Sequence, residues 1–421
     1  MISNKPDPLA AGTTRFFYGY IIVAIAFLIT VMTLGAYFSV GVFFKPIIAE
    51  LGWTRALTSG AVSLTWIVAG LLSIGIGGLN DRFGPRVILT VCVLLSGIGY
   101  LLTSQVSAVW QLYIFYGVLI GVGLCFYVVV SSTVVRWFVK RRTLMIGIVS
   151  TGGGVGMLVA PPIANQLILA YDWRLSYIII GSIYLVVTLI AVQFLKRDPA
   201  RIGQMAYGAN EASGDINYAE ARLFSIRQVV GSSQFWILVI VQICAGIAIH
   251  SAMVHIAPHI TDLGISTTSA ANTLAIIGVI NVVGMIVSGS AGDRMGNRKV
   301  LAVSFILMFV AYLWLLYSKN IWQFYLFAIV FGIGFGGCVT QQAPLVAALF
   351  GLSSYGVVLA LVSLGFTIGA AVGPALAGYI FDVTTGYQMA FWAAAGISII
   401  GLILTILLKP PVPVSTIKTS G

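Results

Sequence analysis

Long apolar segments alternate with short polar segments along the whole chain. Twelve such segments lie at about residues 16–44, 56–79, 87–104, 109–135, 143–170, 175–195, 233–261, 270–291, 300–317, 322–349, 353–381 and 386–408. A helix of about 20 apolar residues crosses the hydrocarbon core of a bilayer. The pattern therefore predicts an all-α membrane protein with twelve transmembrane helices.

A single polar segment interrupts this series at its middle. Residues 196–231 carry acidic residues among Gly, Ser and Asn, a composition typical of a linker rather than a span. We therefore expect an N-terminal bundle of six helices over residues 1–195 and a C-terminal bundle of six helices over residues 232–421, which ends in a short tail.

The placement of charge predicts how the chain lies in the membrane. The chain is 59% hydrophobic and 8% charged, with a formal net charge of +11. Of its 22 Lys and Arg residues, four fall on one side of the predicted spans, and the other eighteen fall on the side of the termini and the linker; the four are Lys45, Arg55, Arg174 and Lys319. Because basic residues accumulate on the cytoplasmic side, we expect the termini and the linker in the cytoplasm. The membrane would be the plasma membrane, or the inner membrane of a bacterium, and no nucleic-acid partner is expected.

A ten-residue motif occurs twice, once in each half of the chain. Residues 77–86 read GGLNDRFGPR after the second span, and residues 289–298 read GSAGDRMGNR after the eighth. An Asp at such a loop can cap the next helix and pair with nearby arginines in one conformation only. The alternative is a plain turn with cytoplasmic arginines. The candidate gating residues are Asp81, Arg82, Arg86, Asp293, Arg294 and Arg298.

Through these two loops the chain resembles the major facilitator superfamily over nearly its whole length. The resemblance implies the major facilitator fold, in which two six-helix bundles work by alternating access around a site between them. A finer resemblance, to the monocarboxylate transporter family and its oxalate/formate antiporter relatives, lies in the loop before the fifth span. The residues that match its signature are Trp137, Phe138, Lys140, Arg141, Arg142, Leu144 and Gly147, followed by Gly152 and Gly156.

The chain departs from that family at the charged positions that often hold a carboxylate. Members of the family often use an arginine on the eighth span with an acidic residue four positions earlier, and some use a lysine on the first span. The matching positions here are Met285, Asn281 and Phe38. The resemblance thus implies a monocarboxylate carrier that lacks the usual fixed charges.

The spans hold polar residues but no charge at mid-membrane, where charges are costly and mark function. The three histidines all lie on the seventh span, and His255 and His250 are the first candidates for substrate contact; His259 lies nearer the outer mouth. A histidine can bind a carboxylate or carry a proton near neutral pH, or it can stay neutral and bond a neighbouring helix. The further candidates are Asn281, Tyr127, Tyr37, Gln341, Gln342 and Phe366, of which Phe366, like Trp66, is read first as a packing residue.

These observations favour a carrier over an enzyme. The sequence has no HExxH motif, P-loop or Cys/His metal spacing, so we expect no cofactor and no metal. We expect a secondary active or facilitative transporter of a small organic solute, most readily a monocarboxylate or related organic acid, with or without a proton. Membrane lipid is the other expected partner, and the chain is expected to be a monomer. The alternatives are an exporter of a hydrophobic or drug-like compound and a membrane receptor that binds solute without transporting it.

Overall fold

The computed structural model describes residues 17–139, 141–208, 226–350 and 355–409, and its described elements are helices. Twelve of the helical segments are long and apolar enough to cross a membrane, which confirms the twelve predicted spans. The helices of the first half are α1 (Gly19–Phe38), α2 (Val40–Leu51), α3 (Arg55–Phe83), α4 (Pro85–Thr103), α5 (Val109–Leu112), the π-helical segment η1 (Tyr113–Ile120), α6 (Gly121–Leu124), α7 (Phe126–Trp137), α8 (Arg142–Ala170) and α9 (Trp173–Gln193). Those of the second half are α11 (Ser233–Asp262), α12 (Thr267–Met295), α13 (Asn297–Leu316), α14 (Ile321–Phe350), α15 (Tyr355–Thr384) and α16 (Gln388–Leu407).

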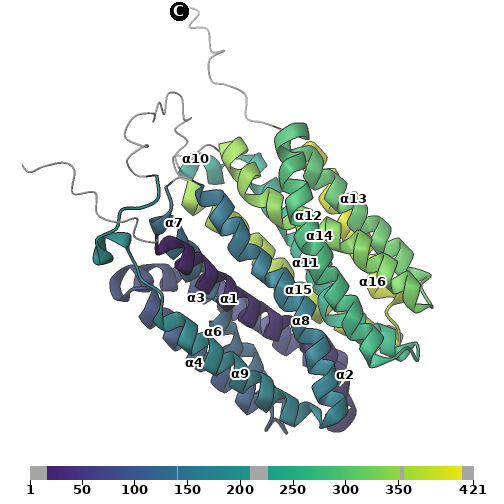
Figure 1. The fold of residues 1–421 in the computed structure, drawn as a ribbon. Helices are drawn as coiled ribbons and strands as arrows, with labels where there is room; N and C mark the ends of the chain where they lie inside the picture. The colour runs from purple at the N-terminus through teal and green to yellow at the C-terminus, as the bar shows by residue number, and fades with distance from the viewer. Residues whose placement is uncertain (1–16, 140, 209–225, 351–354, 410–421) are drawn as a thin grey trace, which may run out of the picture.

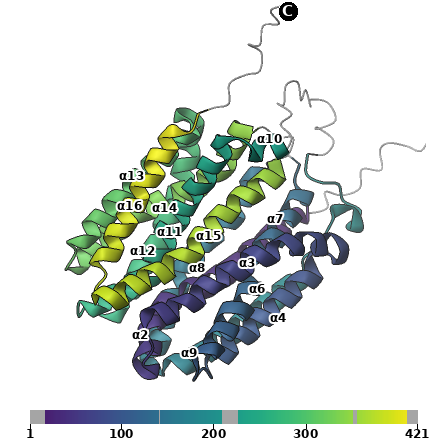
Figure 2. The same cartoon turned by 180° about the vertical axis from the view of Figure 1, so that it is seen from behind.

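The helices of each half gather into one bundle, and the two bundles lie side by side (Figures 1 and 2). Two short helices, η2 (Pro199–Ile202) and α10 (Ile226–Val230), lie between α9 and α11 in the chain. Both ends of the described chain lie at one end of the molecule, which we call the terminal end. The opposite end, where α2 is followed by α3, is called the Arg55 end.

The two bundles use the same close helix contact at equivalent places. In the first, α1 packs against α8, and a Cβ at Gly35 would lie 3.0 Å from the carbonyl oxygen of Gly156. In the second, α11 packs against α15, and a Cβ at Gly369 would lie 3.0 Å from Cα of Gly246. Small residues allow helix backbones to approach in this way. The glycine-rich fifth and eleventh spans are therefore packing surfaces of a repeated bundle.

The halves meet mainly through α3 with α15 and α8 with α12. The hydrogen bonds and ion pairs that join described residues of the two halves lie at the Arg55 end, and they include the 3.1 Å bond from Asn165 to Thr268. Farther along α3 from Arg55, Gly70 lies against the methyl group of Thr367 on α15. The described polar contacts therefore hold the halves together at one end only.

Candidate functional site

A cluster of aromatic side chains surrounds His250 at the middle of the molecule. The imidazole of α11 lies 4.7 Å from the Trp66 ring of α3, 5.5 Å from the Phe366 ring of α15 and 6.3 Å from the Phe38 ring of α1, measured between centroids. The indole nitrogen of Trp66 donates a 2.6 Å hydrogen bond to the hydroxyl of Tyr37. Residues of both halves contribute to the cluster, with Tyr37 and Phe38 at the end of α1, where the first membrane span continues into α2. We call these five residues the central cluster.

Among the described residues, only one ring nitrogen of His250 has a hydrogen-bond partner, so the other can accept a proton. Its Nδ1 lies 3.1 Å from the backbone oxygen of Gly246, one helical turn earlier. A carbonyl only accepts hydrogen bonds, so Nδ1 carries the hydrogen and Nε2 keeps its lone pair. Among the described residues none hydrogen-bonds Nε2. This nitrogen can therefore accept a proton and then donate it in a hydrogen bond to an anion.

His255, just over one turn further along α11, is in a different situation. The side chain is fully buried, and both ring nitrogens bond the protein. Nε2 lies 2.9 Å from the backbone oxygen of Pro374, and Nδ1 lies 3.0 Å from the hydroxyl of Tyr387. That hydroxyl also accepts a hydrogen bond from the guanidinium of Arg55, which belongs to the other half. In this conformation His255 is part of a link between the halves and does not face the central cluster.

Two carboxylates complete the link at the Arg55 end. Asp262 lies 2.6 Å from a guanidinium nitrogen of Arg55 and 3.1 Å from the ammonium of Lys45. Asp382 accepts hydrogen bonds from the backbone nitrogens of Arg55 and Ala56, at 3.0 and 2.7 Å, and so caps the first turn of α3 from the other half. The Arg55 guanidinium also stacks on the ring of Phe381, with its carbon 3.7 Å from the centroid. We call Lys45, Arg55, Asp262, Asp382, His255 and Tyr387 the Arg55 network.

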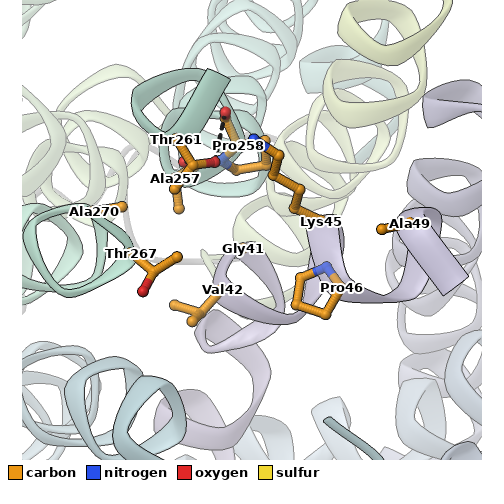
Figure 3. A pocket seen from close by; sticks show the side chains of 10 residues that line it. All are labelled: Gly41, Val42, Lys45, Pro46, Ala49, Ala257, Pro258, Thr261, Thr267 and Ala270. Carbon is orange, nitrogen blue, oxygen red and sulfur yellow. Dashed lines mark hydrogen bonds between the residues drawn. The ribbon is translucent and has the colours of Figure 1, made fainter. Parts of the chain in front are cut away.

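Two clefts flank this network. One, of about 240 Å³, lies between α2, α11 and α12 and is lined by Lys45, Thr261 and Thr267 among others (Figure 3). The second, of about 530 Å³, is lined by Arg55, Asp262, His259 and Tyr387. The charged groups that join the halves thus border open space at the Arg55 end.

The remaining predicted substrate residues have other hydrogen-bond partners or none among the described residues. Asn281 is buried on α12, and its amide nitrogen has no hydrogen-bond partner among the described residues. The side-chain amide of Gln341 donates a 2.8 Å hydrogen bond to the backbone oxygen of Ser288. The amide of its neighbour Gln342 donates a 2.8 Å hydrogen bond to the hydroxyl of Ser363 on α15. Adjacent residues on a helix point in different directions, so the two amides face different helices.

Tyr127 and His259 lie elsewhere again. Tyr127 is 44% exposed on α7, and its hydroxyl lies 3.2 Å from the hydroxyl of Ser150 on α8. His259 packs its ring against Phe391, with the centroids 4.9 Å apart, and borders the larger cleft.

The repeated motif makes the same contact in each half. Arg86, at the start of α4, donates to the backbone oxygen of Gln193 at the end of α9. Arg298, at the start of α13, donates to the backbone oxygen of Leu408 just after α16, at 2.6 Å. The last arginine of each motif therefore ties the third helix of its bundle to the sixth, within one half. The side chains of Asp81 and Asp293 lie outside what the structure describes, while Arg82 and Arg294 are exposed.

The loop before α8 holds the start of the linker. The indole nitrogen of Trp137, which is fully buried, donates a 2.9 Å bond to the backbone oxygen of Lys196. The backbone of Tyr207 is hydrogen-bonded to the same loop: its nitrogen donates to the backbone oxygen of Trp137 at 2.9 Å, and its oxygen accepts from the backbone nitrogen of Val139 at 3.0 Å. Lys140 lies outside the described residues. The aromatic residues of this loop thus fix residues 196–207 to the first half.

Sequence reasoning missed the Arg55 network. It placed Lys45 and Arg55 on the outer side of the spans without giving them a partner. Tyr387 and Trp66 carried no signal beyond being aromatic residues in apolar surroundings. The opposite charges at the same predicted membrane face were the one clue that could have indicated an ion-pair network.

Comparison with known proteins identifies relatives over almost the whole length. A family model described as Major Facilitator Superfamily matches residues 26–291 and 238–421. An uncharacterised MFS-type transporter of Escherichia coli, YhjX, is 25% identical over 82% of this chain and 84% of its own length. Monocarboxylate transporter 4 of Gallus gallus is 26% identical over 91% of this chain and 80% of its own. Monocarboxylate transporter 12 of Mus musculus is 25% identical over 89% of this chain and 82% of its own length. These relatives confirm the resemblance predicted from the loop before the fifth span.

A solved structure has the same fold. The bacterial homologue of the human lysosomal transporter Spinster, in an inward-facing and unoccupied conformation, superposes with a TM-score of 0.76. It is 16% identical and covers 94% of this chain and 98% of its own. The predicted arrangement of twelve helices in this fold is confirmed.

Proposed function

Because this chain belongs to the Major Facilitator Superfamily, and is therefore a multi-pass membrane transporter rather than an enzyme, we propose that it carries a small monocarboxylate together with a proton. The observation that carries the proposal is the free Nε2 of His250 at the centre of an aromatic cluster between the halves. The names of the monocarboxylate transporters among its relatives support the substrate class.

The chemistry of the central cluster favours uptake of proton and anion together. A carboxylate at mid-membrane needs a compensating charge or hydrogen-bond donors. His250 provides both only after Nε2 has taken a proton, since its other nitrogen bonds Gly246. Equally, a neutral acid can donate its own hydrogen to Nε2. Either way, one proton enters the site with each carboxylate, and the rings of Trp66 and Phe366 cover its apolar part.

We propose that the terminal end faces the cytoplasm, and that the structure is the state open to that side. The excess of basic residues at that end supports the orientation. The polar contacts that join the halves at the Arg55 end support the closed outer side. Asn281, Tyr37, Gln341, Gln342 and Tyr127 remain candidate substrate contacts, and the motif residues around Asp81 and Asp293 remain candidate inner gates.

Export of a hydrophobic compound is the second candidate. Its support is that the central cluster consists of aromatic rings and one histidine, without a permanent charge. Such a site would bind an apolar solute without a proton.

Uptake of radiolabelled lactate, pyruvate and acetate into proteoliposomes tests the proposal. With an inward proton gradient, the wild type should accumulate at least one of these acids. His250→Gln keeps a polar side chain but cannot be protonated, so proton-driven accumulation should fall about tenfold or more, equivalent to about 1.4 kcal/mol. His259→Gln, which alters a histidine outside the central cluster, should retain accumulation. Proton-driven uptake that survives in His250→Gln would refute the role of His250, and failure of the wild type with every acid would favour the hydrophobic solute.

A further inference from the structure

When His255 is neutral, the Arg55 network contains a hydrogen-bond chain that runs in one direction. Arginine only donates, so the guanidinium of Arg55 donates to the hydroxyl of Tyr387. The carbonyl of Pro374 only accepts, so Nε2 of His255 carries the hydrogen at 2.9 Å. The hydroxyl hydrogen of Tyr387 then points to the lone pair on Nδ1, at 3.0 Å. This arrangement requires a neutral His255.

We propose that protonation of His255 releases the two halves from each other at the Arg55 end, so that this residue couples the outer gate to protons. A proton on Nδ1 turns it from acceptor into donor. The hydroxyl of Tyr387 would then face two donors, Arg55 and His255, and its own hydrogen would lose its acceptor. The bond that joins Arg55 of the first half to Tyr387 of the second is thereby weakened. The inference rests on the proposed alternating-access transport, and it assigns His255 to the gate and His250 to the solute.

The surrounding charged groups do not compensate the positive charge that a proton adds to His255. The cations facing this site are Lys45 of α2 and Arg55 of α3, and the anions are Asp262 of α11 and Asp382 of α15. They balance in number, and each carboxylate is already bonded to Arg55. A protonated imidazole therefore adds an uncompensated positive charge beside the guanidinium, which favours separation of the halves.

The other neighbours of His255 are aromatic or neutral. On α2 the Phe44 ring lies 5.2 Å from the imidazole, between centroids. His259, the other titratable residue of α11 nearby, contacts the Tyr387 ring, with the centroids 5.5 Å apart. Among the described residues, none hydrogen-bonds its Nε2, so it lies outside the chain from Arg55 to Pro374. His259→Gln is therefore a matched control for a change at His255.

A proton has a short route to this site. His255 itself is buried, but Tyr387 and Arg55 line the larger cleft at the Arg55 end, and Lys45 lines the smaller one (Figure 3). Transient opening of the Arg55–Tyr387 contact would let a proton from the larger cleft reach Nδ1, and the added proton would then keep the contact open. Low pH on this side would thus favour the state open to this side, where the solute would be taken up.

Distance measurement between the halves tests the inference without any solute. The described cysteines are buried, so spin labels can be directed to exposed replacements, Ala49→Cys on α2 and Met389→Cys on α16. In wild-type background, lowering the pH from about 8 to about 4, which begins above the usual histidine pKa near 6.5 and extends well below it, should shift the population toward longer distances. The His259→Gln control should respond as the wild type does.

Two variants should abolish the response in opposite ways. In His255→Gln the amide can donate to Pro374 and accept from Tyr387 without titrating, so the short distance should persist at both pH values. In Tyr387→Phe the link to Arg55 is absent, so the longer distance should be populated at both. A wild type without pH response, or a His255→Gln variant that responds like the wild type, would overturn the inference. Failure of the monocarboxylate proposal is a separate outcome, because it is seen in the uptake assay with His250→Gln.

Discussion

Two glycines show why the repeated motif has its sequence. Gly84 between α3 and α4 has φ 86° and ψ 163°, and Gly296 between α12 and α13 has φ 90° and ψ 137°. This region of backbone space is essentially restricted to glycine. The motif thus uses glycine to turn the chain sharply into the next helix, where Arg86 and Arg298 then reach the sixth helix of their bundle.

We expect Gly84→Ala and Gly296→Ala each to lower the free energy of unfolding by about 1–3 kcal/mol, because a Cβ strains this conformation. Thermal unfolding of the purified protein measures the effect. Gly78→Ala is the matched control, since Gly78 is helical and has open space where a Cβ would lie. It should be neutral or slightly stabilising. Equal effects of all three changes would contradict the backbone explanation.

At the residue scale, the different surroundings of His250 and His255 show what sequence analysis could not predict. The sequence placed His250 and His255 on one span as the first candidates for substrate contact. It could not distinguish them, because the partner of His255 is Tyr387, 132 positions away. Hydrogen bonds between residues so distant along the chain leave no local pattern.

At the scale of elements, the connection between the halves is anchored rather than free at its start. Trp137 and Phe138 are buried, and Tyr207 pairs with their loop through its backbone. The ring of Phe17 also contacts Trp137, with the centroids 5.9 Å apart. Residues predicted to be linker therefore extend the first bundle up to Tyr207, and the family signature at this loop has a structural role.

We expect Trp137→Ala to release residues 196–207, because it removes both the packing and the bond to Lys196. Loss of a buried Trp costs about 3–5 kcal/mol, so hydrogen exchange in this segment should become much faster. Trp137→Phe keeps most of the packing and loses one hydrogen bond, worth about 1 kcal/mol. It should show a smaller increase. Unchanged exchange in Trp137→Ala would show that the segment is held by other contacts.

At the scale of the whole molecule, hydrophobic periodicity predicted more than local chemistry did. The twelve spans and the repeat follow from segment length and from two copies of one motif, which are properties of the sequence itself. The two bundles meet through the packing of α3 against α15 and of α8 against α12. These contacts join opposite halves, so the sequence pattern within one half does not predict them. The Arg55 network arises only from that meeting, so its residues could be placed near the membrane surface but not paired.

The orientation of the whole molecule remains a prediction that charge alone supports. If the terminal end is cytoplasmic, Met205→Cys, at a residue 66% exposed beside the start of the linker, should resist a membrane-impermeant maleimide in intact cells. Met389→Cys, at a residue 57% exposed near the Arg55 end, should react readily. Both should react after the membrane is permeabilised, while the protein without either change should stay unlabelled because its described cysteines are buried. The reverse pattern would place Arg55 and its network in the cytoplasm. In that case the proton that acts on His255 would come from inside the cell, and the same gate would serve export instead of uptake.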